Sequence, residues 1–128
     1  MAIRKTILMP EIALLLSVAL LSMGHGLHST LVNVRASLEG FPLASIGIIN
    51  SLFYVGMLFG SKMGSWFVMR VGHIRVFAAF ASLFSAVALA YAMFPNLWAW
   101  GCLRFLSGIC LSILLLAAES WMNQKASK

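Results

Sequence analysis

The pattern of apolar and polar positions divides the chain into four long hydrophobic stretches separated by short polar breaks. Each stretch is at least as long as the roughly 20 residues that an α-helix needs to cross a bilayer. The pattern predicts an all-α, polytopic membrane protein with four transmembrane helices and no soluble domain. We expect these helices over about 11–34, 42–69, 74–94 and 97–122.

Composition supports a membrane location. The 128 residues are 62% hydrophobic and 9% charged, whereas a soluble domain is about 45–50% apolar and about 25% charged. A protein this small cannot bury such a surplus. A signal peptide competes for the first stretch, because Arg4-Lys5 precedes an apolar run. No small-x-small cleavage site follows, and apolar character resumes at Leu31-Val32, so we expect a membrane helix.

The charge distribution predicts an orientation. A net charge of +6 would also suit nucleic-acid binding, but the cations neither cluster nor alternate with aromatic residues. Four spans place both termini on one side together with six cations, while Arg35 alone lies in a loop on the other. Because cytoplasmic loops carry the excess of Lys and Arg, we expect both termini in the cytoplasm. The six cations are Arg4, Lys5, Arg70, Arg75, Lys125 and Lys128.

The second and third stretches differ in the surfaces that they offer. Gly56, Gly60 and Gly64 recur every fourth residue and line one face of the second helix. Such a face lets another helix approach closely, so helix packing is a better interpretation than ligand binding. The third stretch has no charge or amide beyond Arg75 and is expected to face lipid.

Polar residues lie inside the first and fourth stretches. His25, His28, Ser29 and Asn33 share one arc, because spacings of three, four and eight fall on one side of a helix. Arg104 lies at similar depth in the fourth. A charge near the bilayer centre costs about 2.5–3.5 kcal/mol, so it usually faces protein or a wet cavity. We expect one polar cavity; the alternatives are an arginine reaching headgroups and histidines hydrogen-bonded within the bundle.

Glu119 follows Arg104 on the same helix, about 22 Å away, so the two cannot neutralise each other. Glu119 is level with Arg70 and Arg75 of the basic turn and could pair with them. Gly72 lies between these arginines, where a side chain would obstruct the turn.

Two motifs resemble the major facilitator superfamily of transporters, most closely its YcaD-like branch. The run GSKMGSWFVMRVGHIR, residues 60–75, resembles the family's loop G-x-x-x-D-R-x-G-R-R, and Arg104 to Gly108 resembles its R-x-x-x-G motif. The loop departs from the family pattern where Met69 replaces the acid and Ser65 a glycine, which puts the family's cytoplasmic latch in doubt.

The resemblance implies a location and a function. The family has about twelve helices in two halves that rock around a central site. This chain would correspond to helices one to four, with one and four lining the cavity, in a bacterial inner (plasma) membrane. The whole protein would move a small solute by alternating access, coupled to protons, whereas this chain alone would be inactive.

The resemblance also assigns roles and partners. The basic turn and Glu119 would gate the cavity, and Gly108 would serve helix packing. The partners would be the lipid bilayer, the solute, protons, and missing C-terminal helices or a partner chain, but not nucleic acid. The gating residues are Arg70, Gly72, Arg75 and Glu119.

Other function classes fit less well. Small homodimeric multidrug exporters have four helices but need a carboxylate inside helix one, and Glu11 lies at its mouth. A non-transporting membrane subunit could dock through the glycine face. An enzyme is not expected, because no metal-ligand cluster, phosphate loop or Ser/His/Asp arrangement is present. Cys102 and Cys110 lie in an apolar helix, where a thiol is not activated. No cofactor or metal is predicted.

Overall fold

The computed structural model describes residues 2–126, so Lys128 of the cationic group lies outside the described residues. Residues 2–126 form helices long and apolar enough to cross a membrane. The prediction of an all-α protein with four transmembrane helices is thereby confirmed, and the chain is a multi-pass membrane protein. The helices are α1 (Ala2–Leu38), α2 (Leu43–Val71), α3 (His73–Met93) and α4 (Leu97–Ala126).

The outer helices extend beyond the expected bounds. α1 begins at Ala2 rather than at residue 11, passes through Pro10 and ends at Leu38, so much of the expected connection over 35–41 is helical. α4 continues from residue 122 to Ala126. The ends of α2 and α3 differ by one or two residues. Hydropathy marks the width of the bilayer, whereas a helix can continue into water because its backbone bonds are internal.

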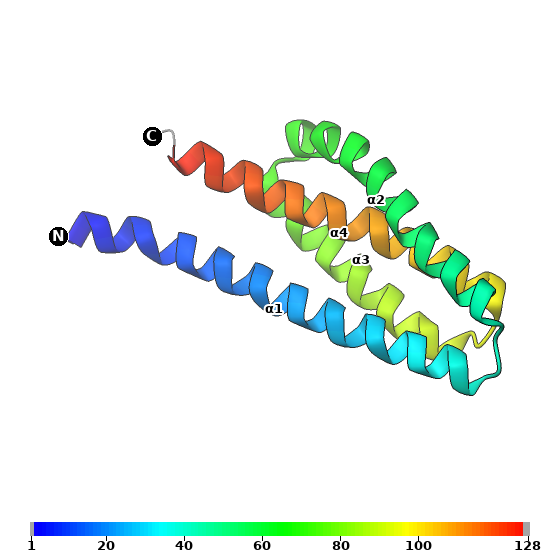
Figure 1. The fold of residues 1–128 in the computed structure, drawn as a ribbon. Helices are drawn as coiled ribbons and strands as arrows, with labels where there is room; N and C mark the ends of the chain where they lie inside the picture. The colour runs from blue at the N-terminus through cyan, green and yellow to red at the C-terminus, as the bar shows by residue number, and fades with distance from the viewer. Residues whose placement is uncertain (1, 127–128) are drawn as a thin grey trace.

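The helices run antiparallel, with both termini at one end of the bundle and the loops 39–42 and 94–96 at the other (Figure 1). α4 is the central helix and packs on α2 and α3. It therefore carries the largest fully buried side chains, which are Trp100, Arg104, Cys110, Ile113 and Leu114.

Glycines bring α2 and α4 into backbone contact. A Cβ added to Gly60 would lie 2.7 Å from the Ile109 carbonyl oxygen of α4. In return, Gly108 of α4 lies against the Phe53 carbonyl of α2. The glycine face of α2 is thus covered by a helix of the same chain, which leaves no free glycine face for a partner subunit. The remaining members of this interface on α2 are Gly56 and Gly64.

Two groups of buried side chains hold the bundle together. The loop-end cluster combines residues from all four helices, whereas the terminal-end cluster uses α2, α3 and α4 only. α1 is therefore anchored through its C-terminal half, and its N-terminal half runs apart from the other helices (Figure 1). The loop-end cluster is Val32, Ala36, Ile49, Val87, Tyr91 and Trp100. The terminal-end cluster is Val68, Val76, Ile113 and Ala117.

About half of the residues of α3 are exposed, but α1 is more exposed still, so the lipid-facing role of α3 stays a prediction. Its buried residues are Val76, Val87 and Tyr91, which belong to the two clusters. One side of α3 is thus part of the protein core.

Candidate functional site

Arg104 is a buried cation at the junction of α4 and α1. Its side chain is 2% exposed, and Nη2 donates to the Ser29 hydroxyl at 3.0 Å and to the Ser29 carbonyl at 3.4 Å. The guanidinium carbon lies 5.9 Å from the centre of the Phe53 ring on α2. Arg104 thus points into the bundle, which is the opposite of the alternative in which it reaches for headgroups.

The hydrogen-bond donors of the Arg104 guanidinium are not all paired within the described residues. Its Nε is buried and has no hydrogen-bond partner within residues 2–126. The ion pair that forms within residues 2–126 joins Arg35 Nε to Glu39 Oε1 at 3.8 Å, on the exposed end of α1. Among the described residues, Arg104 therefore has no carboxylate partner, although a buried charge is costly unless it is paired.

The two histidines lie between helices and contact aromatic rings. His25 stacks on Phe53 of α2, with ring centres 4.9 Å apart, and is tilted against Phe84 of α3 at 5.7 Å. His28 meets the edge of Tyr91 on α3 at 5.0 Å. The Phe53 ring is consequently a neighbour of both His25 and the Arg104 guanidinium.

The expected polar arc of α1 is brought together in part. Ser29 bonds Arg104 directly, His25 shares the Phe53 ring with it as a neighbour, and His28 contacts Tyr91 instead. The backbone carbonyl of Asn33 accepts a hydrogen bond from the Ser37 hydroxyl at 3.2 Å, within α1. Asn33 is half-buried, and no contact places it at the guanidinium.

A cavity of about 250 Å³ borders this group between α1, α3 and α4. Both histidines line it, as do Ser85 and Ser107, and the Ser107 hydroxyl donates to the Leu103 carbonyl at 2.8 Å. We call it the histidine cavity. Its remaining lining is Leu20, Leu21, Gly24, Phe84 and Ala88.

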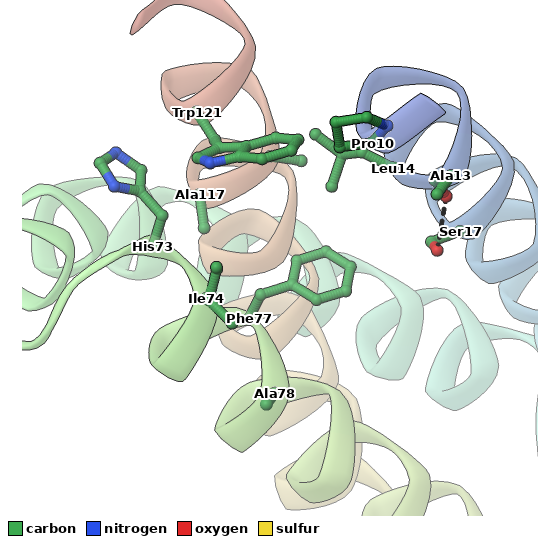
Figure 2. Close-up of a pocket in the computed structure, with 11 residues that line it drawn as sticks. Pro10, Ala13, Leu14, Ser17, His73, Ile74, Phe77, Ala78, Ala117 and Trp121 are labelled. Carbon is green, nitrogen blue, oxygen red and sulfur yellow. Dashed lines mark hydrogen bonds between the residues drawn. The ribbon is translucent and has the colours of Figure 1, made fainter. Parts of the chain in front are cut away.

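A second, larger cavity of about 410 Å³ lies towards the ends that carry the termini. Figure 2 shows Pro10 and Leu14 of α1 facing Phe77 of α3 and Trp121 of α4. The lining is mainly apolar, and the Ser17 hydroxyl donates to the Ala13 carbonyl at 2.8 Å within α1. The sequence did not predict this cavity, because it arises from the separation of α1, and its polar lining residues Ser17 and His73 lie on different helices.

The basic turn between α2 and α3 is built on Gly72. Its φ of 100° and ψ of 158° lie in a region that is nearly restricted to glycine. The next residue, His73, places Nε2 3.0 Å from the Ser120 hydroxyl of α4. The turn is thereby tied to the C-terminal part of the central helix.

The pairing considered between Glu119 and the basic turn is absent within residues 2–126. Arg70 instead lies over the Trp66 ring, at 5.3 Å from its centre, and Arg75 is exposed. Glu119 is exposed on another side of α4. One residue along a helix turns about 100°, so Ser120 rather than Glu119 faces the turn.

The described residues hold no group of three or more His, Cys, Asp or Glu side chains that could bind a metal ion. Cys102 is exposed and Cys110 is buried.

Comparison with known proteins finds relatives that are named as membrane transporters. Over 111 residues it is 25% identical to "Uncharacterized MFS-type transporter YcaD" of Escherichia fergusonii, covering 87% of this chain and 29% of that protein. The protein of the same name in Salmonella newport is 24% identical, with the same coverage. The chain is similar to MFS-type transporters. This confirms the resemblance to the major facilitator superfamily that the loop and R-x-x-x-G motifs indicated.

A further relative, an uncharacterized MFS-type transporter of Enterobacter sp. (strain 638), is also 24% identical over 87% of the chain. The chain spans about 29% of the length of these MFS-type relatives. No family model and no solved structure matches the chain.

Proposed function

We propose that this chain supplies four helices of a solute transporter of the MFS type, equivalent to helices one to four of that fold. The observation that carries the proposal is Arg104, a buried cation without a carboxylate partner in residues 2–126, in a group whose two histidines line a cavity. Charges inside membrane spans mark solute or ion pathways, because their insertion is costly. The similarity to MFS-type transporters over 87% of the chain supports the same function.

Alternating access requires helices that can move relative to one another. α1 is anchored at the loop-end cluster and separated from α3 and α4 by the 410 Å³ cavity at the other end. We propose that both termini lie in the cytoplasm, so that this cavity opens inward. Arg70, Gly72, Arg75 and Glu119 then act in gating at the cytoplasmic face rather than in solute contact.

Proton coupling is assigned to His25 and His28. Histidine titrates near neutral pH, and a second positive charge near Arg104 would be repelled. Release of a proton from either imidazole would therefore change the charge of the cavity. The test is solute uptake by a full-length MFS-type relative in proteoliposomes under an imposed pH gradient. Uptake that is independent of the gradient would exclude proton coupling.

The principal test is the substitution Arg104→Ala at the matching position of a full-length MFS-type relative. Transport should be abolished while insertion and expression stay normal. The matched control is Lys62→Ala, which removes an exposed charge of α2 to which no role in gating or solute contact is assigned. Unchanged transport in the Arg104→Ala variant would remove this residue from the mechanism.

A second test concerns the chain by itself. We propose that these four helices need further helices, from the missing C-terminal part of a transporter or from a partner chain, to enclose a translocation path. The purified 128-residue protein in vesicles should show no solute uptake above empty vesicles. Uptake by it alone would favour a self-sufficient homodimeric exporter.

A further inference from the structure

We propose that the site beside Arg104 binds a small organic anion, with its negative group near the guanidinium and an apolar body in the histidine cavity. This inference rests on the proposed function and specifies its solute class. It is carried by the juxtaposition of Arg104, Ser29, His25 and Phe53 from three helices, next to a cavity of about 250 Å³.

The first step is the charge of the site. Of the ionisable side chains gathered here, Arg104 is a cation, and the imidazoles of His25 and His28 are neutral or cationic. Tyr91, which meets His28 edge-on, is an uncharged phenol at neutral pH. The three carboxylates of the sequence are Glu11, Glu39 and Glu119. None forms an ion pair with Arg104 in residues 2–126. The site is therefore positive, and an anion supplies the missing counter-charge.

The second step is the hydrogen-bonding capacity of the guanidinium. Arginine carries several N–H donors in a planar fork that matches the two oxygens of a carboxylate. Ser29 takes the donation of Nη2, whereas Nε is buried and unpartnered among the described residues. A neutral solute would leave the charge uncompensated, and a cation would be repelled by it.

The third step is the shape and lining of the space. Drug-sized ligand sites have volumes of about 300–1,000 Å³, so a cavity of about 250 Å³ suits a smaller solute. Apolar groups of Leu20, Leu21, Phe84 and Ala88 form much of the wall. An occupant with one anionic group and one small apolar body, such as an aromatic ring, fits both features.

The test is equilibrium binding to the purified 128-residue protein in detergent, with probes of equal size and different charge. Benzoate should bind at least about tenfold more tightly than benzamide, because only the carboxylate forms charge-assisted hydrogen bonds. Benzylamine should not bind measurably. Acetate should bind more weakly than benzoate, because it lacks the apolar body. Equal binding of benzoate and benzamide, or preferential binding of benzylamine, would overturn the proposal.

Variants locate the site. Arg104→Gln should reduce benzoate binding to the level of benzamide, whereas Arg104→Lys should retain part of the preference. Arg75→Gln removes an exposed charge of the same sign and should leave the preference unchanged. A preference that survives Arg104→Gln, or that is lost in Arg75→Gln, would contradict the assignment. The comparison of probes on the unaltered chain decides the question even where a variant does not fold.

The two proposals fail in different ways. Transport of a neutral or cationic solute by an assembled protein would leave the transporter function standing and remove the anion site. Benzoate binding at Arg104 without transport by any assembly would leave the anion site standing and remove the transporter function.

Discussion

The Nη2 atom of Arg104 on α4 lies 3.0 Å from the hydroxyl oxygen of Ser29 on α1. This bond joins the most buried helix of the bundle to the most exposed one. Elsewhere α1 is held chiefly through Val32 and Ala36 of the loop-end cluster. The position of α1, and with it the shape of both cavities, therefore depends on this bond, on that apolar contact and on the ring contacts of His25 and His28.

The first prediction concerns this bond. Ser29→Ala should lower the free energy of unfolding by about 0.6 kcal/mol and by no more than about 1.7 kcal/mol, the average and the maximum for interhelical hydrogen bonds inside membranes. The measurement is unfolding in detergent under increasing denaturant. The control is Thr30→Val, because the Thr30 hydroxyl is exposed and donates to the Gly26 carbonyl of its own helix. Equal effects of the two substitutions would show that the Arg104 bond does not hold α1.

The second prediction concerns the glycine interface of α2 and α4. Gly60→Ala should lower the free energy of unfolding by about 1–3 kcal/mol, because the new Cβ would meet the Ile109 backbone and the Ser112 hydroxyl. Gly47→Ala on the same helix is the control, since a Cβ there has open space within 4 Å. Thermal unfolding of both purified variants makes the comparison. A Gly60→Ala variant as stable as the control would mean that α2 and α4 are not in backbone contact.

The third prediction concerns the turn at Gly72. Gly72→Ala should destabilise the protein by about 1–3 kcal/mol, because its positive φ is strained for any residue with a side chain. The space around it is open, so the effect would come from the backbone alone. Gly26→Ala, in open space on α1, is the control. Circular dichroism during heating should show a lower midpoint for Gly72→Ala only.

The fourth prediction concerns Trp100, which is fully buried and donates its indole N–H to the Tyr91 carbonyl at 3.2 Å. That carbonyl would otherwise accept from residue 95, but Pro95 has no N–H. Trp100→Phe should therefore lower the free energy of unfolding by about 0.5–1.5 kcal/mol, because this hydrogen bond is removed. A further loss follows from the smaller ring.

Trp98→Phe is the control for that substitution, because Trp98 is 83% exposed at the same end of α4. Chemical unfolding followed by circular dichroism compares the two variants. A Trp98→Phe variant that loses as much stability as Trp100→Phe would contradict the role assigned to the indole bond.

The sequence alone determined the number and order of the membrane helices, and it placed Gly60 and Arg104 inside two of them. These features follow from the length of apolar runs and from the helical repeat, which are properties of the chain taken one segment at a time. The motifs were local as well, so similarity to MFS-type transporters was predictable without coordinates.

Only the tertiary structure decided which neighbour each polar group meets. Arg104 bonds Ser29 rather than a histidine, and Ser120 rather than Glu119 faces the basic turn. The choice depends on the rotation of each helix, which changes by about 100° per residue. That rotation is set by the packing of all four helices together. The packing also separates the N-terminal half of α1 from α3 and α4 and so opens the larger cavity. The residues of α1 in the buried clusters are Val32 and Ala36, in its C-terminal half.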